Sequence, residues 1–196
     1  AGGGSRETLS VRRLVAGTRR LGALAMRSGA PLGADALLAF GTVAVDTSAG
    51  RILWTNTSLR IQHENGPGSS PVLWKDRLIF HMDGSDQQYV VALDKHTGKV
   101  AWRSDRSGKM RDHPQLRKSY ATPLLLPVDG REQLISEASD WLYAYDPASG
   151  KELWKLSFGV SGFSQSARAV AGLGRIFLST GFMRPEMLAI DTTKSA

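Results

Sequence analysis

The sequence predicts an all-β protein, specifically a partial β-propeller of four-stranded antiparallel blades. The main evidence is the pattern A-x-D-x-x-x-G-x-x-x-W, which occurs in full at Ala44, Ala92 and Ala144. A fourth copy starts at Ala189 and lacks the tryptophan. The aspartates of the four copies are 48, 52 and 45 residues apart, a period typical of stacked units such as propeller blades. A proline 23 residues before two of these aspartates adds a second periodic mark.

Each copy has the features of a β-hairpin. An alternating apolar run leads into the aspartate, a short polar loop ends at the glycine, and a second apolar run follows. The carboxylate can accept N–H groups of the loop, the glycine permits a positive φ, and the small alanine leaves room for a bulky indole. A structural role therefore explains the motif better than a catalytic one. The motif positions are Ala44, Asp46, Gly50 and Trp54; Ala92, Asp94, Gly98 and Trp102; Ala144, Asp146, Gly150 and Trp154; and Ala189 with Asp191.

The predicted strands extend from this frame over residues 41–196. They are 42–45 and 52–56 in an incomplete blade, 71–74, 78–82, 88–93 and 99–103 in the next, 123–126, 133–136, 141–145 and 151–157 in a third, and 167–171, 175–179 and 187–190 in the last. This amounts to about three to four blades, whereas propellers close with about four to eight. We therefore expect a fragment of a larger propeller, with the missing blades of the parent as natural partners.

The motif resembles the tryptophan-docking motif of PQQ-like, quinoprotein-type β-propeller repeats. That superfamily includes quinoprotein alcohol dehydrogenases and BamB-like outer-membrane assembly lipoproteins, and the stretch from His63 onward is most similar to uncharacterised bacterial PQQ-like repeat proteins. The resemblance implies that each Trp packs against the Ala and Gly of the adjacent blade. It also implies a periplasmic or cell-envelope location and a ring of seven or eight blades.

Charge and composition exclude some classes of function. The formal net charge is +7, but residues 1–40 alone contribute six arginines against two acidic residues, and no basic stripe follows. We therefore expect no nucleic-acid partner. No apolar run is long enough for a transmembrane segment. The chain has no cysteine, so it lacks the adjacent-cysteine disulfide that the resemblance implies for many quinoprotein dehydrogenases.

Residues 1–40 form an Arg-, Gly- and Ala-rich head that shares nothing with the repeat. We expect this head to be poorly ordered or helical, with Leu14, Leu21, Leu24 and Ala25 on one helix face. A transit peptide, a membrane-surface helix and a wrongly assigned gene start are the alternatives. The segment starts at Ala1 and lacks the pattern of a signal peptide.

Loops between strands two and three of a blade, and loops between blades, gather on one face of a propeller, where ligands usually bind. Each polar residue there has two explanations, ligand contact or a solvated loop. The candidates are His63, Glu64, Asn65, Asp83, Asp86, Arg111, Asp112, His113, Tyr120 and Asp140, together with Gln165, Arg184 and Glu186.

No catalytic, cofactor-binding or metal residue is assigned from the sequence. The four histidines are scattered, and Asp83 and Asp86 bracket a turn without the longer carboxylate series of an EF-hand. No nucleophile elbow or phosphate-binding loop is present.

Two functions follow from the resemblance. The first is a non-catalytic, BamB-like scaffold that binds a protein or cell-envelope partner and needs no cofactor. The second is a fragment of a quinone-dependent alcohol or sugar dehydrogenase, which would use PQQ with calcium.

Overall fold

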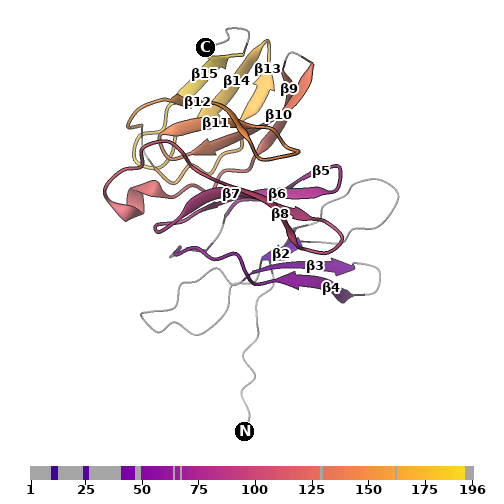
Figure 1. Cartoon of the computed structure of the whole chain (residues 1–196). Coiled ribbons are helices and arrows are strands. Elements are labelled where there is room, and N and C mark those ends of the chain that lie inside the picture. Colours follow the sequence, from indigo (N-terminus) through magenta and orange to yellow (C-terminus); the bar gives the residue numbers. More distant parts are fainter. Residues whose placement is uncertain are drawn as a thin grey trace.

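The computed structural model describes residues 10–12, 24–26, 41–46, 50–63, 65–66, 68–128, 130–161 and 163–192. They form four antiparallel sheets that follow one another in chain order (Figure 1). Blade 1 contains β1 (Ser10–Arg12), β2 (Leu24–Met26), β3 (Thr42–Asp46) and β4 (Arg51–Asn56). Blade 2 contains β5 (Val72–Trp74), β6 (Arg77–Asp83), β7 (Gln88–Asp94) and β8 (Val100–Asp105). Blade 3 contains β9 (Leu124–Val128), β10 (Arg131–Ala138), β11 (Trp141–Tyr145) and β12 (Glu152–Ser157), and blade 4 contains β13 (Val170–Gly172), β14 (Arg175–Ser179) and β15 (Met187–Asp191).

The predicted fold class is confirmed, and the strands from β3 onward lie close to their expected positions. The first strand of blade 4 begins at Val170, three residues later than expected. The long polar connection between blades 2 and 3 contains a short 3₁₀ helix, η1 (Pro114–Arg117), which the sequence analysis did not predict. Proline at the start of η1 suits the helix, because an N–H at this position would have no partner within the helix and its loss costs no hydrogen bond.

Two short strands lie within the segment that the sequence analysis separates as a head. β2 pairs with β3, with Leu24 opposite Ala44, and β1 pairs with β2. Leu24 and Ala25, expected on a helix, are therefore in a strand, and blade 1 has four strands where two were predicted. Leu14 and Leu21 lie outside the described residues, and the division at residue 41 stays a prediction.

Three apolar clusters hold successive blades together. Alternate residues of β7 point in opposite directions, as the two-residue period of a strand requires. Val91 and Leu93 join the cluster that includes Leu59 and Ile61, which follow blade 1, whereas Val90 and Ala92 pack with Tyr143 and Tyr145 of blade 3. The third cluster joins blades 3 and 4. Each sheet is thus covered on a face by its neighbour in the chain.

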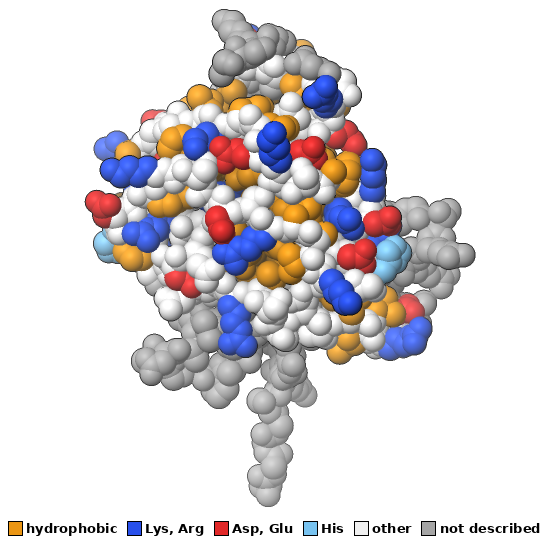
Figure 2. Space-filling model, viewed as in Figure 1, with side chains coloured by type: hydrophobic (Ala, Val, Ile, Leu, Met, Phe, Trp, Pro, Cys, Tyr) orange, Lys and Arg blue, Asp and Glu red, His pale blue; other side chains and the backbone are white. Residues whose placement is uncertain are grey.

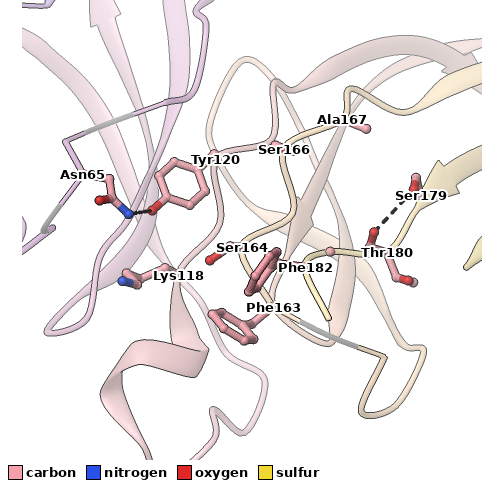
Figure 3. A pocket seen from close by; sticks show the side chains of 11 residues that line it. Asn65, Lys118, Tyr120, Phe163, Ser164, Ser166, Ala167, Ser179, Thr180 and Phe182 are labelled. Carbon is pink, nitrogen blue, oxygen red and sulfur yellow. Dashed lines mark hydrogen bonds between the residues drawn. The ribbon is translucent and has the colours of Figure 1, made fainter. Parts of the chain in front are cut away.

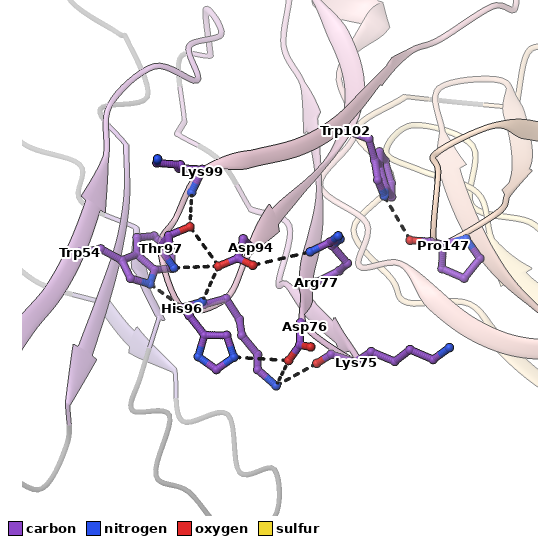
Figure 4. Close-up of polar contacts among 11 residues, drawn as sticks. Trp54, Lys75, Asp76, Arg77, Asp94, His96, Thr97, Lys99, Trp102 and Pro147 are labelled. Atoms are coloured by element: carbon purple, nitrogen blue, oxygen red, sulfur yellow. Dashed lines mark hydrogen bonds and ion pairs between the residues drawn. The ribbon is translucent and has the colours of Figure 1, made fainter.

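The loop after Asp94 shows how each repeat hairpin is built (Figure 4). The Asp94 carboxylate accepts hydrogen bonds from the N–H of His96 and from the N–H and hydroxyl of Thr97. Burial works to raise the pKa of Asp94, but these hydrogen bonds outweigh it and hold the pKa below its ordinary value. Gly98 closes the loop at φ +71° and donates its N–H to the Asp94 carbonyl.

The indoles of two repeats reach the next blade. Trp54 donates from Nε1 to the Lys95 carbonyl at 2.9 Å, and Trp102 donates to the Pro147 carbonyl at 3.1 Å (Figure 4). A side chain at Gly98 would collide with the Trp54 ring, and one at Gly150 would collide with the Trp102 ring. Trp154 differs, because its Nε1 donates to the Gln133 side chain within its own blade, at 2.9 Å.

Candidate functional site

A groove of about 560 Å³ opens among the loops that precede and join the blades (Figure 3). Its walls come from the loop before blade 2, the connection from blade 2 to blade 3, the connection from blade 3 to blade 4, and the end of β14. The lining residues are Asn65, Lys118, Tyr120, Phe163, Ser164, Ser166, Ala167, Ser179, Thr180, Gly181 and Phe182.

Tyr120 organises one wall of the groove and brings three predicted candidates together. Its hydroxyl accepts a hydrogen bond from Asn65 Nδ2 at 3.1 Å, and its ring meets the His63 ring edge-on at a centroid distance of 4.5 Å. A side chain at Gly68 would collide with the Tyr120 ring, so the loop can pass close to it only at a glycine. These contacts fix the loop before blade 2 against the connection to blade 3.

Two phenylalanines form the opposite wall. Phe163 and Phe182 meet edge to face at a centroid distance of 5.8 Å, and the Phe182 N–H donates to the Phe163 carbonyl at 2.7 Å. Ser164 and Met183, beside them in the chain, both have positive φ, which is uncommon for residues other than glycine. The Phe182 side chain is 65% exposed, although large apolar side chains normally avoid water. This wall therefore offers an aromatic surface held in a fixed backbone conformation.

The polar lining of the groove consists of hydroxyl groups, one amide and one cation. Lys118 is buried, and its amine donates to the Gln115 side chain. The Thr180 hydroxyl donates to the Arg184 carbonyl and accepts from the Glu186 N–H, so it closes the loop at the end of β14. Arg184 and Glu186, both predicted candidates, thus contribute backbone atoms to this loop. None of the described residues that line the groove is acidic.

Asp83 does not belong to the exposed loop in which the sequence analysis placed it. Its carboxylate is buried against Arg106, which donates from Nη2 at 2.7 Å and from Nε at 3.1 Å, and both side chains are 0% exposed. Burial works to lower the pKa of Arg106, but the facing carboxylate outweighs it and raises the pKa. Burial also raises the pKa of Asp83, and the charge of Arg106 opposes that shift. The two hydrogen bonds identify an ion pair that is part of the packing between blades 2 and 3.

The same buried network continues across the blade interface. Arg106 also donates to the Ser136 hydroxyl at 2.6 Å, and that hydroxyl lies 2.8 Å from Nε2 of His81. Burial, assisted by the charge of Arg106, lowers the pKa of His81 well below its ordinary value. His81 is therefore a neutral interior residue.

The remaining candidates serve the loops themselves. Asp140 pairs with Arg111, Asp86 accepts the Gln62 N–H at 2.7 Å, and Asp112 accepts an Arg117 hydrogen bond at its carbonyl. His113 is exposed and precedes η1, where its carbonyl accepts the Leu116 N–H. Gln165 is completely buried, and Glu64 lies outside the described residues.

The described residues do not assemble a site that fits PQQ with calcium. Calcium takes six to eight oxygen ligands, usually with several carboxylates, and no group of three or more His, Asp or Glu suited to a metal occurs among them. PQQ carries three carboxylates, whereas the groove offers one lysine.

Much of the groove was not anticipated from the sequence. Lys118, Phe163 and Phe182 fit no motif, and the two phenylalanines are far apart in the chain. A signal in the sequence is the repeat itself, because Tyr120 and Gln165 precede their blades at similar offsets. In the structure the Tyr120 N–H donates to the Gln165 carbonyl at 2.6 Å.

Comparisons with known proteins support the repeat assignment. Residues 39–121 match the family model described as outer membrane protein assembly factor BamB. Over these residues the repeats are similar to those of that family. A curated relative, 1-butanol dehydrogenase (quinone) of Thauera butanivorans, is 30% identical over 125 residues, which cover 57% of this chain and 19% of the relative. The chain thus spans about a fifth of the length of the curated relatives it matches.

Two solved structures show the extent of the shared fold. BamB from Moraxella catarrhalis matches with a TM-score of 0.58 and 14% identity, over 87% of this chain and 46% of that chain. The computationally designed Ika4 protein matches with a TM-score of 0.51 and 11% identity, over 95% of this chain and 94% of that chain. At these identities the likeness concerns the fold alone.

Charges of both signs are mixed on the face of the molecule that Figure 2 presents. Figure 2 shows Lys and Arg side chains interspersed with Asp and Glu over the viewed face, with apolar atoms between them. The expectation of no nucleic-acid partner stays a prediction. Within the described part of the chain, no helix has the length and apolarity needed to cross a membrane.

Proposed function

We propose that this chain is a non-catalytic, PQQ-like propeller scaffold that binds a protein partner through the groove. The observation that carries the proposal is the composition of the groove: three aromatic rings and several hydroxyl groups, with no acidic side chain among the described lining residues. Enzymes that transfer protons or hydride need a positioned base, and Asp83 and Asp140 are already paired with arginines. Aromatic side chains are enriched at the centres of protein interfaces.

The proposed partner is a protein of the cell envelope. The matching family model is that of an outer membrane protein assembly factor, which supports this location. An extended segment with apolar side chains suits the groove, because the exposed ring of Phe182 can cover one such side chain while Asn65 and the serines bond to the peptide backbone.

A capture experiment tests the scaffold. The immobilised chain is incubated with detergent-solubilised envelope proteins, and bound proteins are identified by mass spectrometry. We expect Phe182→Ala and Tyr120→Ala to lose the specific partner, because each removes a wall of the groove. Leu173→Ala, at an exposed turn outside the groove, is the matched control and should retain it. Equal capture by all variants would contradict the proposal.

The second candidate function is part of a quinone-dependent alcohol dehydrogenase. It is supported by the relative that is 30% identical and named as a quinone-dependent 1-butanol dehydrogenase. Titration with PQQ and Ca²⁺ distinguishes the candidates: a shift of the visible absorbance band with alcohol-dependent reduction of a dye would favour the dehydrogenase. The scaffold predicts neither signal.

A further inference from the structure

Glu137 places a buried carboxyl at the interface between blades 3 and 4. Along β10, Leu134 and Ala138 pack with residues of blade 2, whereas Ile135 joins the cluster shared with blade 4. Side chains alternate along a strand, so Glu137 lies on the same face as Ile135 and points toward blade 4. Its side chain is 2% exposed, and neither carboxylate oxygen has a hydrogen-bond partner among the described residues.

The repeat shows why this carboxyl lacks a partner. Glu137 occupies in blade 3 the position of His81 in blade 2, because each lies opposite the residue two places before the alanine of its motif. His81 lies 2.8 Å from the hydroxyl of Ser136, which the following blade supplies. By the same register, the position of Ser136 in blade 4 is taken by Leu178, whose side chain has no polar atom. The hydroxyl that serves one interface is thus replaced by an apolar side chain at the next.

The neutral form of Glu137 is the one that fits this interface. Burial raises the pKa of Glu137 to about 8, and no neighbouring charge among the described residues opposes the shift. In the adjoining connection and loop, Lys118 is bonded to Gln115 and Asp140 to Arg111. The other charged or titratable groups lie on the opposite face of β10, at the far end of blade 4, or in solvent; they are Asp83, Arg106 and His81, Arg175 and Asp191, and Arg168, Arg184 and Glu186.

The backbone of Glu137 is tied to the wall of the groove. Its carbonyl accepts the Ser119 hydroxyl at 3.1 Å, and Ser119 stands between Lys118 and Tyr120 of the groove lining (Figure 3). Ser119 also forms a parallel β-bridge with Gln165, which is 0% exposed and whose side-chain amide has no hydrogen-bond partner among the described residues. Opening of the interface would therefore reach the groove and let water hydrate both buried groups.

We propose that Glu137 is a pH-dependent latch of the groove. With its proton, blades 3 and 4 stay packed and the groove keeps its shape; without it, blade 4 loosens together with the groove wall that it carries. An ionised carboxylate with no partner is costly in the interior, and opening the interface to water removes that cost. Weaker partner binding at higher pH follows only if the groove has the proposed scaffold function, whereas the latch itself does not depend on a partner.

Opening should become easier as the pH rises through the neutral range. In the open interface the carboxyl releases its proton above its ordinary pKa of 4.5, whereas the closed interface retains the proton up to about pH 8. Between these values the opening equilibrium should increase by up to about tenfold per pH unit, and above them it should level off.

Amide hydrogen exchange followed by mass spectrometry tests the latch in the absence of any partner. Between pH 6 and 8, after correction for the intrinsic exchange rate, protection of residues 163–182 should fall by up to about tenfold per pH unit relative to β6 and β7. Glu137→Gln keeps a neutral side chain of similar size and should abolish this additional pH dependence. Glu186→Gln, at an exposed position of blade 4, is the matched control and should behave as the wild type.

Three results would overturn the latch: an unchanged pH dependence in Glu137→Gln, an equal loss of protection in all blades of the wild type, or no loss at all. Glu137→Met is a second neutral variant if the amide disturbs the fold, and circular dichroism at pH 6 checks both. The wild-type pattern alone separates local opening from global unfolding. Because exchange requires no partner, a failed capture experiment leaves this result intact, and failure of the latch leaves the scaffold proposal standing.

Discussion

At the scale of single residues, the buried ion pair of Arg106 with Asp83 is the contact whose loss should cost most. Asp83→Ala leaves the guanidinium uncompensated in the interior, so we expect a loss of about 3–5 kcal/mol in the free energy of unfolding. Urea titration followed by tryptophan fluorescence measures it. Asp105→Ala removes the exposed pair with Arg103 and should cost less than about 1 kcal/mol. Similar losses in both variants would contradict the assignment of Asp83 to the interior.

Glu137 makes a second residue-scale prediction, which concerns pH. Its side chain is 2% exposed with no hydrogen-bond partner in the described structure, and burial raises its pKa to about 8. Glu137 therefore keeps its proton in the folded state at pH values at which the unfolded chain has already released it. The contribution of Glu137 to the free energy of unfolding is complete below pH 4.5. As the pH rises from there to about 8, this contribution falls by roughly 1.4 kcal/mol per pH unit. Urea midpoints from pH 5 to 8 should fall less steeply in Glu137→Gln, and the exposed Glu186→Gln should follow the wild type.

At the scale of the elements, the indole contact between neighbouring hairpins should be measurable at a glycine. Gly150 and Gly130 both have positive φ, at +74° and +75°, but only Gly150 lies against a ring, that of Trp102. Alanine at either position costs about 1–2 kcal/mol from backbone strain. We expect Gly150→Ala to lower the unfolding free energy further, because its Cβ also displaces the indole. Equal thermal and urea stability of the two variants would show that the indole contact contributes little.

The elements also show what could be predicted from the sequence. The hairpins were predictable because aspartate, glycine and the alternating apolar residues act within one loop. The meeting of Phe163 with Phe182 was not, because it depends on backbone pairing between distant loops. β1 and β2 were not predicted because each is only three residues long and lies in the Arg-, Gly- and Ala-rich head, outside the repeat pattern. Asp83 was misplaced because its arginine partner lies more than twenty residues away.

At the scale of the whole molecule, stability should be concentrated in the middle of the arc. β6, β7, β10 and β11 contain most of the side chains that are 0% exposed, whereas β13 and β15 are the outer strands of their sheet. Local opening is easiest where few apolar contacts are lost. Amide hydrogen exchange should therefore be slowest in β6, β7, β10 and β11 and faster in β13 and β15. Uniform exchange across all blades would contradict this distribution.

The positions of the methionines have a practical consequence for this protein. Met183, next to Phe182 in the chain, and Met187 of β15 are both more than 70% exposed, whereas Met82 is 4% exposed within the core. Peroxide converts accessible thioethers to polar sulfoxides. Mild oxidation during purification would therefore change the surface beside the groove wall at Phe182, while the core around Met82 stayed intact.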